Sequence, residues 1–149
     1  NLYVGKSSDN YEGKVCLSII NTWSGPKWTS IMHIGSVLVS IQSLLDENPL
    51  RNEPGFEKES SFRNSNYNRI VEYDTYQQLI YNHCFENQSF QEFQEIIKDH
   101  INKNKEDILS KLDELCNKNP KKVIISLDIY NIYMTINYQL IRDKIQFKI

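Results

Sequence analysis

Residues 13–23 read GKVCLSIINTW, and residues 28–49 read WTSIMHIGSVLVSIQSLLDENP. The first stretch follows a loop rich in Gly, Ser, Asp and Asn, so Cys16 lies where a loop gives way to a short extended run. The second stretch has the length of a helix, and Thr29 or Ser30 can cap its start. We therefore expect a solvent-accessible Cys16 ahead of a central helix.

That helix is apolar around most of its circumference. Between Ile31 and Leu45 the exception is a narrow polar stripe formed by Ser36, Ser40 and Ser43. A helix that is apolar nearly all round is typical of a buried position. The sequence therefore predicts that this helix is central and largely buried.

Two further helical regions are indicated by the spacing of apolar residues. One runs from Tyr67 to Cys84, and the other begins at the capping box Ser89–Glu92. The second has a weak point at Asn102–Lys105, where we expect a bend or a break. The polar residues from Arg51 to Asn66 contain Pro54 and Gly55, which predicts a surface loop.

The last part of the chain has a different composition. From Val123 onward Ile, Tyr, Thr and Asn predominate, which fits strands better than helix. Residues 123–141 contain a single charge, on Asp128, so a membrane anchor has to be considered. The many polar residues among them disfavour a membrane span. We therefore separate residues 120–149, as a tail of uncertain structure, from residues 1–119.

Composition excludes several classes of protein. Seventeen basic and nineteen acidic side chains give a net charge of -2, so nucleic acid is not a predicted partner. The three cysteines are widely spaced and form no CxxC pair, which predicts neither disulfides nor a zinc site and favours a reducing compartment, the cytoplasm or the nucleus. No signal core, metal constellation or phosphate loop is recognisable, and no cofactor is predicted.

Four short motifs together resemble the ubiquitin-conjugating enzyme family: GKVCLSIINTW at 13–23, WTS at 28–30, SLLDENP at 43–49 and NEPGFE at 52–57. The NTW variant, with its Gly-containing loop before the second Trp, is most similar to the giant apollon/BRUCE-type enzymes. The resemblance implies an α+β, ubiquitin-conjugating-enzyme-like fold, here mostly helical because the family's N-terminal helix and strand meander are missing. Residues 1–119 would then be the C-terminal portion of the core domain.

The resemblance also implies a reaction. Cys16 would accept ubiquitin as a thioester and pass it to a lysine amine or to a ligase, a role that suits a thiolate because it attacks carbonyls readily and leaves a reactive ester. The family places an asparagine near the cysteine to stabilise the oxyanion, for which Asn1 is the candidate and Asn10 the alternative. Leu50 to Glu53 match the segment that orients and deprotonates the incoming lysine, and Asn52 is our choice there.

Partner surfaces follow from the same alignment of motifs. Ser30 and Ile31 fall where the family presents a Pro-Ala pair to RING-type ligases. Four residues match the face on which the donor ubiquitin folds back: Ser36, Val39, Ser40 and Ser43. Helix packing is the alternative for the serine stripe. The implied partners are ubiquitin, a ubiquitin-activating enzyme and a ubiquitin ligase.

Two other functions stay open at this stage. The chain could be a catalytically inactive module of the same fold that binds ubiquitin or a ligase; Cys16 favours the enzyme, whereas the missing front half favours the module. A helical adaptor with a membrane-associated tail is the third interpretation. Without the strand meander we expect the helix at Ile31–Leu45 to expose an apolar patch, and without the first helix we expect this chain alone to be charged poorly.

Overall fold

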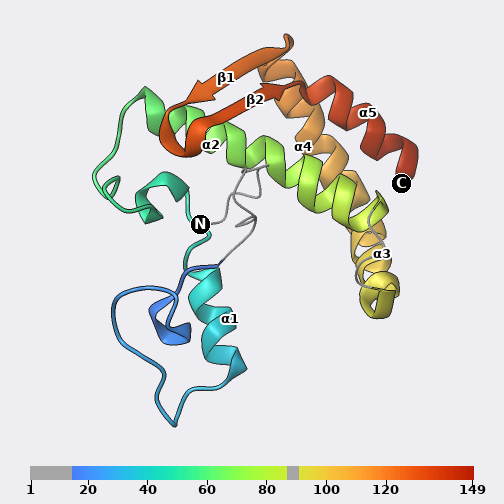
Figure 1. The fold of residues 1–149 in the computed structure, drawn as a ribbon. Coiled ribbons are helices and arrows are strands. Elements are labelled where there is room, and N and C mark those ends of the chain that lie inside the picture. The colour runs from blue at the N-terminus through green and yellow to red at the C-terminus, as the bar shows by residue number, and fades with distance from the viewer. Residues whose placement is uncertain (1–14, 87–90) are drawn as a thin grey trace. The chain divides into compact units, whose positions relative to one another are not determined.

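The computed structural model describes residues 15–86 and 91–149, and the chain forms two compact units, Asn1–Val71 and Glu72–Ile149 (Figure 1). Helices predominate, and a two-stranded antiparallel sheet completes the structure, so the predicted mostly helical α+β class is confirmed. The short 3-10 helices and one π-helix, η3, carry the symbol η. In chain order the described elements are η1 (Ser18–Ile20), α1 (Ile34–Gln42), η2 (Pro49–Asn52), α2 (Phe62–Asp74), η3 (Thr75–Glu86), η4 (Gln91–Phe93), α3 (Gln94–Lys103), α4 (Lys105–Lys118), β1 (Val123–Leu127), η5 (Ile129–Asn131), β2 (Ile132–Ile136) and α5 (Tyr138–Lys148).

The first unit contains η1, α1, η2 and most of α2. The Tyr67 hydroxyl, on α2, donates a hydrogen bond to the buried carboxylate of Glu53 at 3.4 Å. This bond ties the NEPGFE loop to α2. Among residues 15–71, the buried apolar side chains are Leu17, Leu50, Tyr67 and Ile70.

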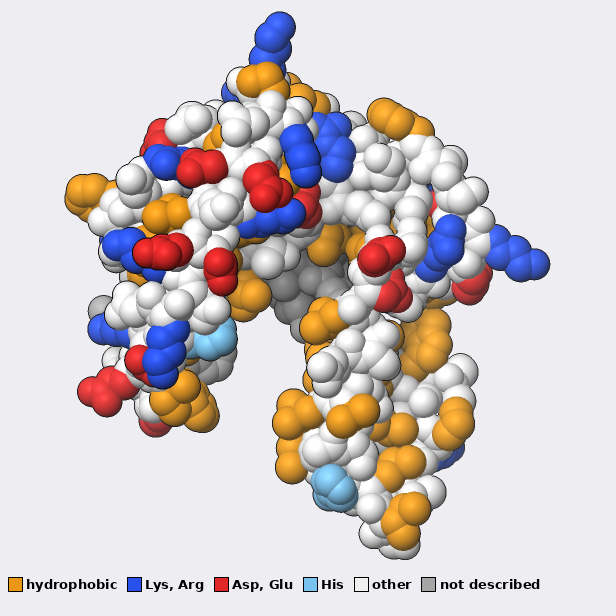
Figure 2. All heavy atoms as spheres, turned by 180° about the vertical axis from the view of Figure 1, so that it is seen from behind, with side chains coloured by type: hydrophobic (Ala, Val, Ile, Leu, Met, Phe, Trp, Pro, Cys, Tyr) orange, Lys and Arg blue, Asp and Glu red, His pale blue; other side chains and the backbone are white. Residues whose placement is uncertain are grey.

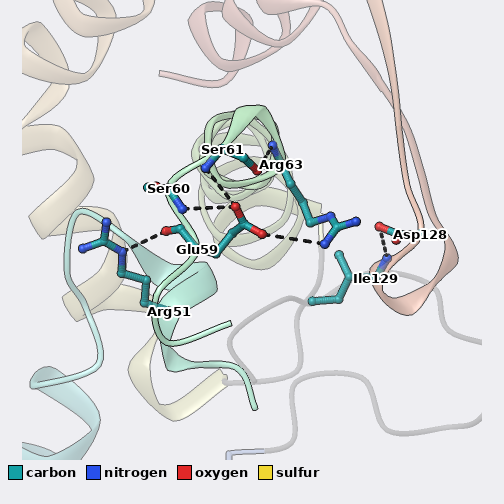
Figure 3. A network of polar contacts seen from close by, with 7 residues as sticks. All are labelled: Arg51, Glu59, Ser60, Ser61, Arg63, Asp128 and Ile129. Atoms are coloured by element: carbon teal, nitrogen blue, oxygen red, sulfur yellow. Dashed lines mark hydrogen bonds and ion pairs between the residues drawn. The ribbon is translucent and has the colours of Figure 1, made fainter. Parts of the chain in front are cut away.

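Helix α2 begins inside the range 51–66 that the sequence predicts to be a loop. Its start is held by Ser61, whose Oγ accepts from the N–H of Arg63 at 3.2 Å. The carboxylate of Glu59 accepts from the N–H groups of Ser60 and Ser61 at 3.1 and 2.8 Å (Figure 3). Hydrogen bonds from the Ser61 hydroxyl and N–H hold the pKa of Glu59 below its usual value. A negative charge at this end of the helix complements the helix dipole.

Helices α3 and α4 take the place of the single long helix that the sequence predicts after residue 89. They are split at Asn104, within the weak point predicted at Asn102–Lys105. The Nδ2 group of Asn104 donates to the carbonyl of His100 at 2.7 Å. This side-chain bond competes with the backbone hydrogen bonds of the helix, and α3 ends here. Ser89, the predicted cap, lies outside the described residues.

Strands β1 and β2 confirm the prediction of extended structure for residues 123–136. They pair with Leu127 opposite Ile132, and the turn between them holds Tyr130 and Asn131 in the left-handed region, at φ 54° and 51°. One face of the hairpin is buried. Its buried side chains are Ile125, Leu127, Ile132 and Ile136.

The prediction of strands is wrong for the end of the chain, which forms helix α5. Tyr138, Ile141 and Ile145 are buried at helical spacing, and α5 contacts α4 and η3. The rings of Tyr138 and Tyr73 meet edge to face with centroids 5.4 Å apart, and the Tyr138 hydroxyl donates to Glu72 at 3.2 Å. Within residues 15–86 and 91–149, every helix is too short or too polar to cross a membrane.

Candidate active site

Cys16 lies at the start of a tight turn formed by residues 15–25, which we call the Cys16 turn. The extended run predicted from KVCLSII holds only as far as Leu17, at φ -135° and ψ 142°, because η1 begins at Ser18. Cys16 is half-buried, so the residue is partly accessible, as the sequence predicts.

The side chain of Thr22 fixes the backbone on both sides of Cys16. Its Oγ1 accepts from the N–H of Leu17 at 2.9 Å and lies 3.2 Å from the carbonyl oxygens of Val15 and Leu17, to which the hydroxyl can donate. The N–H of Thr22 also donates to the carbonyl of Leu17 at 3.1 Å. One threonine therefore positions both neighbours of the candidate nucleophile.

Gly25 is needed for the chain to close this turn. It has φ 137°, and a Cβ placed there would lie 3.0 Å from Cβ of Ser18. That conformation and that distance both disfavour any larger residue. No role for Thr22 or Gly25 was predicted from the sequence. Threonine side chains often form hydrogen bonds with nearby backbone in turns, and this tendency is the signal that could have identified Thr22.

The other two cysteines lie where burial opposes ionisation of the thiol. Burial raises the pKa of the Cys84 thiol, and burial followed by the charge of Asp113 raises the pKa of the Cys116 thiol. The Cys84 thiol also donates to the carbonyl of Leu79 at 3.1 Å. A raised pKa keeps a thiol protonated at neutral pH, and the reactive species is the thiolate. These observations favour a structural role for both residues.

Asn52 is anchored through its amide nitrogen. Nδ2 donates to the carbonyl of Leu44 and to the carboxylate of Asp46, each at 3.1 Å. These bonds are typical of an asparagine that shapes a turn. Its Oδ1 makes no hydrogen bond to the described residues, so this oxygen could accept one from an incoming amine. The role of Asn52 toward a substrate lysine stays a prediction.

Helix α1 is shorter than predicted, and its cap is neither Thr29 nor Ser30. His33 caps it instead: Nδ1 accepts from the N–H of Gly35 at 3.1 Å, and the Ser36 hydroxyl accepts from the N–H of His33 at 3.3 Å. This cap was not predicted because histidine is not among the residues usually found there.

The prediction that this helix is buried is wrong. No residue of α1 is buried, and Ile31, Ile34 and Val39 are 87%, 71% and 66% exposed. Figure 2 shows hydrophobic side chains gathered over the lobe that contains α1. The exposed surface matches the expectation of an uncovered apolar patch, and patches of this kind mark interaction sites.

The predicted ubiquitin-binding and ligase-binding residues all lie on α1 or beside it. Ser40 and Ser43 donate to the carbonyls of Ser36 and Ser40 at 2.9 and 2.7 Å, so these two hydroxyl protons are used within the helix. Ser36 and Ser40 are half-buried; Ser30, Ile31, Val39 and Ser43 are exposed. Asn1 and Asn10, the candidate oxyanion residues, lie outside the described residues.

The segment that carries this geometry is similar to known proteins. Residues 9–80 match the family model described as ubiquitin-conjugating enzyme, a stretch that contains the Cys16 turn, α1 and Asn52. The similarity to the ubiquitin-conjugating enzyme family therefore covers just under half of the chain. The match explains why the Cys16 turn and the NEPGFE loop occur together, and it agrees with the fold class expected from the resemblance.

Relatives of this ubiquitin-conjugating segment are much longer proteins. Ubiquitin-conjugating enzyme E2 Z of Homo sapiens is 56% identical over 64 residues, which cover 42% of this chain and 18% of that protein. E2 Z of Xenopus tropicalis is 55% identical over 64 residues, covering 42% and 20%. Probable ubiquitin-conjugating enzyme E2 23 of Arabidopsis thaliana is 36% identical over 105 residues, covering 62% and 9%. The chain thus spans at most about a fifth of each relative.

Proposed function

We propose that the protein carrying this chain is a ubiquitin-conjugating enzyme that holds ubiquitin as a thioester on Cys16. The Cys16 thiolate attacks the carbonyl that joins ubiquitin to the activating enzyme; the bond to that enzyme breaks and its group leaves. A lysine amine or a nucleophile of a ligase then attacks the new thioester, and the Cys16 thiolate leaves. The observation that carries this proposal is the position of Cys16 in the matched segment, on backbone that Thr22 fixes on both sides. The raised pKa values of Cys84 and Cys116 support the choice of Cys16.

The partners of this reaction are ubiquitin, a ubiquitin-activating enzyme and a ubiquitin ligase. The exposed residues Ser30 and Ile31 are the proposed ligase contact, and the α1 face that includes Val39 is the proposed contact for the donor ubiquitin. Asn52 is proposed to receive the substrate lysine through Oδ1. The cytoplasm and the nucleus are the proposed locations, in line with three unpaired cysteines.

We also infer a kinship with the large conjugating enzymes of the apollon/BRUCE type. Support comes from the NTW motif with its Gly25-containing loop. Further support comes from two relatives that are large proteins, since the matched segment covers only 9% of the length of each.

The chemistry is tested on the full-length protein that carries this chain, incubated with activating enzyme, ATP and ubiquitin. We expect a ubiquitin adduct that thiol reductant removes, which identifies a thioester. Cys16→Ser should abolish it or convert it to a reductant-resistant ester, whereas Cys84→Ser and Cys116→Ser should leave charging intact. A reducible adduct that survives Cys16→Ser would refute the assignment of the nucleophile.

A further inference from the structure

An apolar groove lies entirely within the second unit, which holds none of the residues assigned to conjugation. Its volume is about 770 Å³, within the range of roughly 300 to 1,000 Å³ common for ligand sites. Its walls come from η3, α3 and α4, together with Glu72 near the end of α2. Most of it lies beyond residue 80, where the match to the conjugating-enzyme family ends.

The groove has a buried floor and exposed apolar edges. Ile101 forms part of the floor and is 6% exposed, whereas Leu79 and Ile96 line the groove and are 58% and 67% exposed. Side chains of this size cost free energy when left in water. The edges are therefore surfaces that an apolar partner would stabilise by covering them.

One wall is the π-helix η3, which runs for 12 residues. π-Helical segments are rare, are usually a single turn long and occur often at functional sites. Tyr76, Ile80 and Cys84, spaced by four residues, line the groove from this wall. An unusually long segment of π-helix therefore shapes the groove.

Two acidic side chains and one lysine line the groove, together with His100. Glu72 and Asp107 line it, and the structure shows no ion pair for Asp107 among the residues it describes. The amine of Lys111 also lines it but is held by the carboxylate of Glu114 at 3.2 Å. Burial raises the pKa of Tyr76, and the charges of Glu72 and Glu114 raise it further, as expected where the local field is negative.

We propose that this groove binds an amphipathic helix of a partner protein, with apolar side chains on one face and Lys or Arg beside them. Helices dock into apolar grooves through residues three and four apart, so the partner would place such a row over Leu79, Ile96 and Ile101. Its basic residues would lie against Glu72 and Asp107, where opposite charge favours the encounter and fixes the orientation. This site is separate from the proposed conjugation chemistry.

The proposal is tested with a fluorescein-labelled synthetic peptide of Leu, Ala and Lys that forms an amphipathic helix. A matched peptide carries Glu in place of every Lys. Fluorescence anisotropy with the full 149-residue chain should show saturable binding of the Lys peptide and about tenfold weaker binding of the Glu peptide, with the difference shrinking as salt is added. Equal binding of both peptides, or no saturable binding of either, would overturn the proposal.

Two pairs of variants locate the binding, with folding checked by circular dichroism. Asp107→Asn should weaken binding of the Lys peptide about two- to fivefold, whereas Glu106→Gln, its neighbour outside the groove, should not. Ile96→Ser should weaken it by about tenfold, whereas Leu140→Ser, exposed on α5 and also outside the groove, should not. Equal effects within either pair would contradict the placement. Laurate that displaces the peptide while Asp107→Asn has no effect would assign the groove to anionic amphiphiles instead.

Discussion

Replacing Asp74 by Asn should stabilise the protein at neutral pH and have no effect in acid. The Asp74 side chain, on the last turn of α2, belongs to a residue that is 7% exposed, and its Oδ1 has no hydrogen-bond partner among the described residues. Burial raises its pKa from 3.8 to about 6, although a hydrogen bond from the side chain of Gln78 opposes the rise. The folded protein therefore binds this proton more tightly than the unfolded chain does.

The size of the effect follows from the two pKa values. Above about pH 6 the carboxylate of Asp74 is ionised in both states, and the difference between 3.8 and about 6 destabilises the folded state by about 3 kcal/mol. As pH falls from about 6 to about 4, the folded state takes up the proton first and this cost disappears. Asn resembles the protonated carboxyl group, so Asp74→Asn should recover up to about 3 kcal/mol at pH 7.5 and nothing below about pH 4.

Urea unfolding followed by far-UV circular dichroism between pH 4 and pH 8 measures this. Asp99→Asn is the control, because that carboxylate is exposed and paired with Lys103 at 2.7 Å, so its loss should change the free energy of unfolding by no more than about 1 kcal/mol. A gain from Asp74→Asn that is the same at every pH, or a loss at pH 7.5, would refute the reasoning.

The two remaining predictions concern the stability of the first unit. For both, urea unfolding followed by Trp fluorescence measures the free energy of unfolding. Thr22→Val should lower the free energy of unfolding by about 1 to 3 kcal/mol, because it removes the hydroxyl that accepts and donates hydrogen bonds beside Cys16. The control Thr29→Val should change the free energy of unfolding little. A similar loss from Thr29→Val would contradict the role of Thr22. Gly35→Ala should not give the gain of about 1 kcal/mol usual in helices, because the new Cβ would lie 2.7 Å from the His33 ring. The gain should return in a His33→Ala background; its absence there would show that the ring is not the obstacle.

Local signals predicted those parts of the fold that local forces decide. The split of the long helix at Asn104 follows from a run of polar residues, and the strands of residues 123–136 follow from β-branched and aromatic residues. Helix α5 was missed although its signals were present. Asn137 accepts from the N–H of Leu140 at 3.1 Å as a cap, but the Ile-rich and Tyr-rich composition hid the helical spacing of Tyr138 and Ile141.

Burial and the candidate site depend on contacts between distant residues. An apolar helix such as α1 is stabilised when another surface covers it, but the pattern of its own residues does not specify that surface. The burial of α1 was therefore predicted wrongly. Cys16 could be identified because the surrounding motif resembles a family. The bonds from Thr22 to Val15 and Leu17 require the chain to reverse direction, which local propensity does not specify.

The turn of the β1–β2 hairpin bears on the order in which the second unit folds. Tyr130 and Asn131 both adopt left-handed backbone, which costs roughly 1 to 2 kcal/mol for most residues with a side chain, such as Tyr, and less for Asn. Glycine adopts this conformation at little cost, but neither position is glycine here. Closing this loop therefore costs free energy, and the strands gain most from pairing when their buried face, with Leu127 and Ile132, covers an apolar surface. We therefore expect α4 and α5 to form before the hairpin closes, although the hairpin precedes α5 in the chain.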